Sequence, residues 1–141
     1  MKAIIISGTR DVPRSLVPEL SDVVVDLVNE LGQWTVMVHG DARGVDTVAS
    51  DAWRGVGRSE PLAMPAPWEE YRQDPAKRVS DAGKDRNEDM LRVLLALERC
   101  GYDIAVHAFP GPSSRGTWHM VNIAKAAGVK VVLHDTLRGG S

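Results

Sequence analysis

Three loops of this sequence combine glycine with residues that bind anions. They read SGTRD, HGDARG and PGPSSRG, and each holds an arginine close to glycine. Glycine lets backbone N–H groups approach a ligand closely. The guanidinium groups of Arg10, Arg43 and Arg115 donate forked hydrogen bonds that suit phosphate or carboxylate. The residue types in these loops therefore favour binding of a phosphate-bearing ligand.

Each loop precedes a segment with helical spacing, and a helix N-terminus offers unpaired N–H groups and partial positive charge to an anion. In the last loop we expect Gly111 and Gly116 to make the site, and Ser113 and Ser114 to be more dispensable. The full set of candidate ligand-binding residues is Gly8, Thr9, Arg10, His39, Gly40, Arg43, Gly44, Asp46, Trp68, Arg86, Asn87, Pro110, Gly111, Arg115, Gly116 and Thr117.

Four of these candidates have alternative interpretations. Asp46 starts a helical segment, where it either caps the helix or contacts a ribose hydroxyl. Trp68 lies in an irregular segment, where it packs as part of a lid or stacks on a base. Arg86 and Asn87 lie near a predicted helix start, where the helix dipole disfavours arginine. Both residues are either solvated residues of the first turn or ligand contacts. We expect Arg86 to be an exposed first-turn residue that contacts a bound anion or an acidic partner.

Strand-like and helix-like segments alternate along the chain and must position these loops. Short apolar runs typical of buried strands occupy residues 2–7, 34–39, 61–65, 103–109 and 129–134. Apolar residues recur at helical spacing over residues 15–31, 45–57, 84–101 and 117–128. Residues 66–83 show no clear period and are interpreted as a loop or lid that contains at most a helical turn.

This alternation predicts an α/β fold: a single Rossmann-like domain with a doubly wound, mostly parallel five-stranded sheet and helices on both faces. Ligands of such sheets bind outside the carboxyl ends of the strands, which is where the three loops fall. We expect the domain to span residues 1–134, with a flexible tail at 135–141. The sequence does not decide whether the final Gly-Gly-Ser is native.

Composition narrows the functional classes. The 141 residues carry a net charge of -2, which disfavours non-specific nucleic-acid binding, so we expect no nucleic-acid partner. Cys100 is the one cysteine, so no disulfide forms within the chain. The N-terminus is too short for a signal peptide, and no apolar run reaches the length of a membrane span. These features predict a soluble cytoplasmic protein without a membrane partner.

Several familiar cofactor sites are absent. The sequence has no GxxxxGK[ST], which disfavours a P-loop NTPase, and GDARGVD is not the GxGxxG of a standard NAD-dependent dehydrogenase. The spacing of His39, His107 and His119 matches no zinc pattern, so we predict no metal site. No cofactor is assured, and the expected ligand is of nucleotide type.

Five blocks together resemble one family. They are SGTRD, VHGDARGVDTVASDAW, PAPWEEY, AGKDRNEDML and AFPG…RGTWHMVNIAKAAGVKVV, and they cover roughly residues 3–133. Their order and spacing resemble the YspA-like family of the SLOG superfamily, which is common in bacteria and phages. The resemblance implies a Rossmann-like domain that binds a nucleotide or nucleotide-derived ligand, such as a nucleoside phosphate or an ADP-ribose-like molecule, as a sensor or sequestering protein.

A more distant resemblance concerns the lonely-guy phosphoribohydrolases, which cut the N-glycosidic bond of a nucleotide. RNEDM places Arg86 and Met90 on their helix motif, and PG…GT matches their PGGxGTxxE. Met120 stands at the position of their catalytic glutamate, and His119 is its neighbour. This family also implies a homodimer formed through helices beside the site.

Three functions follow from these patterns. The favoured one is binding of a nucleotide-type ligand. The first alternative is a nucleotide N-glycosidic hydrolase in which Arg86 orients the substrate and His119 or Asp46 handles the proton. The second alternative is a nucleic-acid-binding module, by analogy with the DNA-processing branch of the superfamily.

Overall fold

The computed structural model describes residues 1–57 and 59–137. Its five strands are β1 (Lys2–Gly8), β2 (Val36–His39), β3 (Leu62–Ala63), β4 (Asp103–Phe109) and β5 (Val131–Leu133). Its helices are the 3-10 turn η1 (Arg14–Leu16) and the α-helices α1 (Val17–Leu31), α2 (Val45–Val56), α3 (Trp68–Gln73), α4 (Asp81–Arg99) and α5 (Arg115–Ala126).

The strands form one sheet in the order β3-β2-β1-β4-β5, and every pairing is parallel. The chain starts at the centre of the sheet, adds strands toward one edge, and returns to build the other half. The direction in which the chain adds strands therefore reverses between β1 and β4. These two strands pair over seven residues, from Lys2↔Asp103 to Gly8↔Phe109. In doubly wound sheets such a reversal opens a crevice at the carboxyl ends of the strands. The predicted α/β fold is confirmed.

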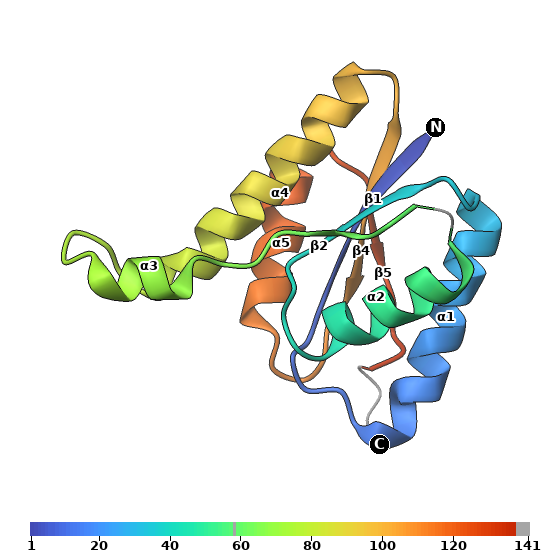
Figure 1. The fold of residues 1–141 in the computed structure, drawn as a ribbon, viewed down its shortest axis with the longest axis horizontal. Helices are drawn as coiled ribbons and strands as arrows, with labels where there is room; N and C mark the ends of the chain where they lie inside the picture. The colour runs from blue at the N-terminus through green and yellow to red at the C-terminus, as the bar shows by residue number, and fades with distance from the viewer. Residues whose placement is uncertain (58, 138–141) are drawn as a thin grey trace.

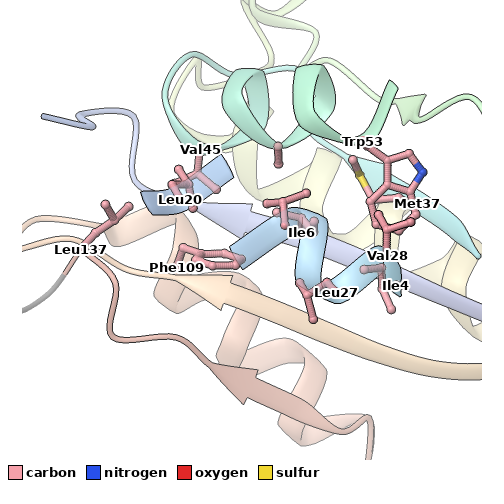
Figure 2. Close-up of a cluster of buried hydrophobic side chains, with 12 residues drawn as sticks. Ile4, Ile6, Leu20, Leu27, Val28, Met37, Val45, Trp53, Phe109 and Leu137 are labelled. Atoms are coloured by element: carbon pink, nitrogen blue, oxygen red, sulfur yellow. The ribbon is translucent and has the colours of Figure 1, made fainter. Parts of the chain in front are cut away.

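Helices cover both faces of the sheet, with α1 and α2 on one side and α4 and α5 on the other (Figure 1). Successive residues of β1 point to opposite faces. Ile4 and Ile6 pack with α1, α2 and Phe109, in the core shown in Figure 2, while Ala3 and Ile5 pack with α4 and α5. Burial on both faces explains why β1 is an unbroken apolar run.

Two segments differ from the sequence prediction. Residues 66–83 are not a featureless loop, because Trp68–Gln73 form α3 and α4 begins at Asp81, three residues before the predicted start. The early turns of α4 carry few apolar residues, so hydrophobic periodicity did not reveal them. The third strand is reduced to Leu62–Ala63 at the sheet edge. In Figure 1, α3 projects beyond the sheet beside the start of α4.

The last described residue contributes to the core on the α1 side. Leu137, within the segment predicted to be a tail, is buried against this cluster. Residues 138–141, which include the final Gly-Gly-Ser, lie outside the described residues. Within the described part of the chain, no helix combines the length and apolar character that crossing a membrane requires.

Candidate functional site

A cleft of about 630 Å³ lies at the carboxyl edge of the sheet, where the loops after β1, β2 and β4 meet α3, α4 and α5. We call it the larger lobe. A smaller lobe of about 290 Å³ adjoins it. The two lobes share the lining residues Arg10, Ala42, Arg43, Trp68 and Arg86. Both volumes are of the order that small-molecule sites occupy in proteins.

The structure brings most of the predicted residues to this cleft. The larger lobe is lined by Gly8, Thr9, Arg10, Arg43, Asp46, Trp68, Arg86, Asn87, Arg115, Gly116 and Thr117. Gly40 lines the smaller lobe. Four predicted residues line neither lobe: His39, Gly44, Pro110 and Gly111.

Three of these four hold the loops in place. Gly44 has φ 82°, and a Cβ there would lie 2.4 Å from the carbonyl oxygen of Thr9. A Cβ on Gly111 would lie 3.1 Å from the side chain of Thr9. His39 is buried, and its Nδ1 accepts a hydrogen bond from the backbone N–H of Asp41 at 3.0 Å. These residues act one layer behind the cleft surface.

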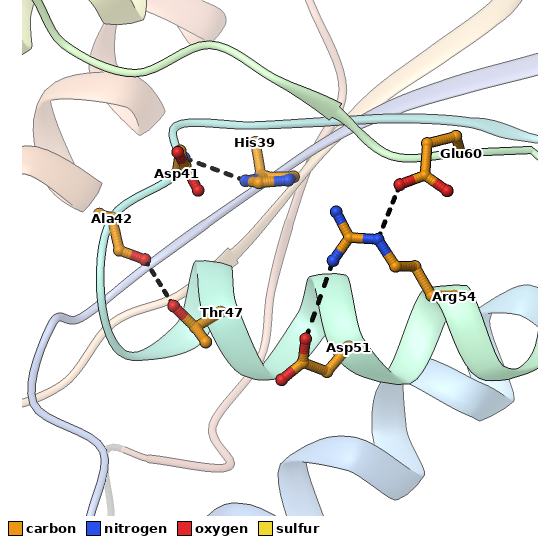
Figure 3. Close-up of polar contacts among 7 residues, drawn as sticks. All are labelled: His39, Asp41, Ala42, Thr47, Asp51, Arg54 and Glu60. Carbon is orange, nitrogen blue, oxygen red and sulfur yellow. Dashed lines mark hydrogen bonds and ion pairs between the residues drawn. The ribbon is translucent and has the colours of Figure 1, made fainter.

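Figure 3 shows the polar contacts around the loop that follows β2. The hydroxyl of Thr47 donates to the carbonyl oxygen of Ala42 at 3.1 Å, which ties the loop to the first turn of α2. Further along α2, Arg54 pairs with Glu60 at 2.7 Å and with Asp51 at 3.8 Å. These ion pairs are largely exposed, so they contribute little to stability. Arg54 lines neither lobe of the cleft.

The prediction that Arg86 is an exposed first-turn residue is wrong. Because α4 begins at Asp81, Arg86 lies in its second turn and is half-buried. Its Nη1 donates to the carbonyl oxygen of Gly40, and its Nε donates to Oδ1 of Asn87 at 3.0 Å. Burial lowers the pKa of Arg86, yet the ordinary value is so high that the group stays charged. Arg86 therefore joins α4 to the loop after β2 and also presents its charge to the cleft.

Asp46 caps the loop after β2 and not the helix, while its contact with a ribose hydroxyl stays a prediction. It lies in the first turn of α2, and its Oδ2 accepts hydrogen bonds from the backbone N–H groups of Gly40 at 2.9 Å and Ala42 at 3.2 Å. The side chain also lines the larger lobe. Burial raises the pKa of Asp46 from 3.8 to about 6, while the two backbone hydrogen bonds and the charge of Arg86 oppose the rise.

Asp46→Asn should stabilise the protein near neutral pH. A raised carboxyl pKa means that folding favours the protonated form, so the stabilisation is complete below pH 3.8 and is lost as pH rises toward 6. Two pKa units correspond to about 3 kcal/mol. Asparagine stays neutral and keeps an oxygen acceptor for the loop amides. The free energy of unfolding should be measured in urea at pH 4 and pH 7. The variant's free energy of unfolding relative to the parent's should rise by roughly this amount between the two pH values. If the free energies of unfolding of the variant and the parent changed equally with pH, burial of the Asp46 carboxylate would cost little free energy.

Asn87 links α4 to the start of α5. Its Nδ2 lies 3.2 Å from the carbonyl oxygen of Gly116 and 3.1 Å from Nδ1 of His119. His119 lines the larger lobe, whereas Met120 is fully buried in the core beneath α4 and α5. The position that matches the lonely-guy glutamate therefore faces the core, and the histidine beside it faces the cleft.

Trp68 lines both lobes. The guanidinium carbon of Arg10 lies 5.3 Å from the centre of its ring, and a Cβ on Gly83 would lie 3.3 Å from the ring edge. The neighbouring Tyr71 donates a hydrogen bond from its hydroxyl to Asp85, and this bond raises the pKa of Tyr71 to about 12. These contacts fix α3 against α4, so the indole lies in a defined position.

Sequence reasoning missed one face of α4. Ser80, Gly83, Lys84 and Met90 line the larger lobe together with Asn87, at helical spacing. This spacing was readable once the helix start was known, but the predicted start at residue 84 hid it. The other lining residues that were not predicted as ligand contacts are Ser7, Asp11, Asp41, Ala42, Pro65, Ala66, Ser113, Ser114 and His119.

The two serines of the last loop differ from each other. Ser113 is exposed and lines the cleft. Ser114 is buried, and its Oγ accepts a hydrogen bond from the backbone N–H of Gly111 at 2.7 Å. Ser114 therefore supports the loop from within, because removing its hydroxyl leaves a buried N–H without a partner. That both serines are more dispensable for the ligand stays a prediction.

The cleft is positively charged although the chain is not. Its basic lining residues are Arg10, Arg43, Lys84, Arg86 and Arg115. Its acidic lining residues are Asp11, Asp41 and Asp46, of which Asp46 is buried. Among the described residues, Arg43 is the one basic lining residue that forms an ion pair, with Asp11 at 3.4 Å. The unpaired cations favour an anionic ligand.

No family model matches the chain. The Gene 61 protein of Mycobacterium phage D29 is 33% identical over 111 residues, which cover 79% of this chain and 80% of that protein. The match therefore extends over most of both proteins.

Two solved structures share the fold. TM1055 superposes with a TM-score of 0.60 at 20% identity, over 99% of this chain and 78% of that chain. DNA processing protein A from Helicobacter pylori, described for its single-stranded DNA binding mode, superposes with a TM-score of 0.58 at 18% identity. That match covers 94% of this chain but only 64% of the larger protein. At these identities the likeness establishes the fold alone.

Proposed function

Since the chain belongs to the family of the Gene 61 protein of Mycobacterium phage D29, whose name states no activity, we propose a function from the cleft itself: binding of a nucleoside phosphate. The observation that carries this proposal is the concentration of five basic side chains around one cleft in a chain of net charge -2. Such a concentration favours an anion.

The phosphate would lie at the start of α5. A helix N-terminus carries partial positive charge and unpaired N–H groups. At Gly116, in the first turn, no heavy atom lies within 4 Å of where a Cβ would stand, so the space in front of the helix is open. Arg115 and Lys84 line the same lobe and form no ion pair among the described residues.

The base would lie against Trp68, which lines both lobes. Aromatic side chains stack on nucleobases, and Arg10 over the indole adds a cation that is free to contact the phosphate or sugar. The ligand class agrees with the resemblance to YspA-like proteins. The fold shared with DNA processing protein A supports the SLOG superfamily, and the YspA-like assignment is part of this proposal.

Hydrolysis of the ligand is less well supported than binding. Met120 is in the core, so the lonely-guy glutamate has no counterpart in the cleft. Asp46 is the buried carboxyl group of the cleft, but its Oδ2 already accepts two backbone hydrogen bonds. A phosphoribohydrolase needs a carboxylate beside the sugar. Met120 supplies none, and the carboxylate of Asp46 is held by the loop amides through Oδ2.

Single-stranded DNA is the second candidate ligand. The net charge of the chain disfavoured a nucleic-acid partner, but a protein with this fold is described as binding single-stranded DNA. The local charge of the cleft matters more than the net charge, and basic side chains beside an aromatic ring that lines a cleft, as Trp68 does, are features that hold single strands. The expectation of no nucleic-acid partner therefore lacks support.

Calorimetry with AMP and with ribose 5-phosphate tests the proposal. AMP should bind the parent more tightly, because only AMP has a base to stack on Trp68. Trp68→Ala should weaken AMP binding by roughly 5- to 150-fold, the equivalent of about 1–3 kcal/mol for one stacked base, and should leave ribose 5-phosphate unchanged. Equal losses for both ligands would show that Trp68 shapes the cleft rather than stacking.

Trp34→Ala is the matched control, because Trp34 is 68% exposed and lies outside both lobes. An oligothymidylate measured over a range of salt concentrations separates the second candidate, since its affinity should fall steeply with salt. Binding of the oligonucleotide without AMP would replace the first proposal by the second. Chromatography of the AMP mixture completes the test, because hydrolysis would release adenine.

A further inference from the structure

One chain of side-chain hydrogen bonds runs from Arg86 through Asn87 to His119 at the cleft. Arg86 Nε lies 3.0 Å from Asn87 Oδ1, and Asn87 Nδ2 lies 3.1 Å from His119 Nδ1. Asn87 is 3% exposed, so its amide has few other partners. The order of donors and acceptors along this chain determines which nitrogen of His119 carries the proton.

Two partners fix the orientation of the Asn87 amide. Arginine has no acceptor, so the amide atom that faces Arg86 must be the oxygen. On its other side, Asn87 faces the carbonyl oxygen of Gly116 at 3.2 Å, and a carbonyl accepts only, so the atom there must be the NH2 group. Both constraints give the same orientation, with the NH2 group directed at His119.

The protonation of His119 follows from this orientation. Its Nδ1 faces a donor and must accept, so the neutral ring carries its hydrogen on Nε2. Burial lowers the pKa of His119, which keeps the ring neutral at pH 7. The charged groups that face it are Glu88, Asp85 and Lys84 on α4. On its own helix, Arg115 lies four residues earlier, on the same side of α5, and also lines the lobe.

We propose that Asn87 holds His119 as the neutral Nε2–H tautomer, so that His119 offers the cleft a hydrogen-bond donor and not a base. With Arg115 and Lys84 it forms a wall that only donates, and such a wall fits an acceptor-only ligand group, namely an oxyanion such as phosphate. Asn87 is then a positioning residue. The ligand assignment rests on the proposed function, whereas the tautomer does not.

The tautomer is tested first, on the ligand-free protein. Nitrogen-15 NMR distinguishes a protonated from an unprotonated ring nitrogen, and comparison with His119→Gln identifies the signals of His119 among the four histidines. At pH 7.5 we expect Nε2 to be protonated and Nδ1 unprotonated. A protonated Nδ1 in the parent would overturn the proposal without any variant.

Asn87→Asp tests the role of Asn87. A carboxylate accepts only, so it should draw a proton onto Nδ1 of His119 and raise the pKa of the ring. The expected signature is a change of Nδ1 from unprotonated to protonated at pH 7.5. A merely structural residue would not produce this change. An Asp variant with Nδ1 still unprotonated would show that another group sets the tautomer.

The ligand assignment is tested by AMP binding to His119→Gln and His119→Leu. The Gln amide can place an N–H where His119 Nε2–H lies, whereas Leu fills the space without a donor. We expect Gln to stay within about threefold of the parent, and Leu to lose tenfold or more, the scale of a hydrogen bond to a charged group. Equal loss in both would exclude the donor role. A parent that binds no AMP would refute the proposed function while the NMR result stands.

Discussion

Gly116→Val should abolish nucleotide binding while leaving the fold intact. Gly116 lies in the first turn of α5, where a Cβ would meet nothing within 4 Å. Its φ is not positive, so valine adopts the backbone without strain. Because a helical Cβ leans toward the helix N-terminus, the valine side chain would occupy the space in front of α5. Affinity for AMP should fall by about 100-fold or more, with an unchanged circular dichroism spectrum and melting temperature.

Gly55→Val is the matched control for this change. Gly55 also lies within an α-helix, α2, and a Cβ there likewise meets nothing within 4 Å, but the residue lines neither lobe. Both variants exchange the same atoms in helical backbone, so any general effect of valine is shared. If a folded Gly116→Val protein bound AMP as the parent does, the ligand would not approach the start of α5.

Gly44→Ala should destabilise the protein by about 3 kcal/mol or more, combining backbone strain with overpacking. The residue has φ 82° and ψ -127°, a conformation that L side chains rarely adopt. An alanine Cβ would also lie 2.4 Å from the carbonyl oxygen of Thr9, which accepts a hydrogen bond from the backbone N–H of Val45 at 3.0 Å. Relief of the clash requires the loops after β1 and β2 to separate. The measurement is the free energy of unfolding in urea.

Gly128→Ala separates the two contributions to this loss. Gly128 has φ 74°, but a Cβ there meets nothing within 4 Å. The control should therefore lose only the conformational cost of about 1–2 kcal/mol. If both variants lost the same free energy of unfolding, the loops after β1 and β2 would be able to move apart at little cost. A larger loss at Gly44 would establish that this glycine joins two cleft walls, although it does not itself line the cleft.

The two glycines illustrate different uses of one residue type in this site. Gly116 leaves space that a ligand can fill, whereas Gly44 lets two backbone segments approach each other. Both belong to loops that follow parallel strands and precede helices, so their sequence contexts look alike. Sequence reasoning assigned both to the ligand, and only the neighbours of each Cβ distinguish them.

The catalytic alternatives depend on a similar distinction. Adjacent residues of a helix point about 100° apart, so only one of His119 and Met120 can face the cleft. The sequence alignment with PGGxGTxxE drew attention to Met120, but the core beneath α5 takes that side chain. His119 faces the lobe with its Nδ1 already occupied by Asn87. The cleft is therefore better equipped to hold an oxyanion than to move a proton.

The sequence by itself determined the fold and the location of the cleft. Apolar runs such as residues 2–7 and the helical spacing of residues 15–31 depend on local period alone, and their alternation requires a parallel sheet. A parallel sheet collects the loops after its strands at one edge, so SGTRD, HGDARG and PGPSSRG were predictable neighbours. Their arginines also indicated an anionic ligand before any contact was known.

The tertiary structure alone decided what each residue does there. Arg86 reaches the carbonyl oxygen of Gly40, 46 residues earlier in the chain, and this contact made it half-buried. The same holds for Asn87, whose partners Gly116 and His119 lie on another helix. Local periodicity reflects interactions within a few residues, whereas burial, the donor partner of an imidazole and the space beside a glycine arise where distant segments pack together. No pattern within a single segment carries that information.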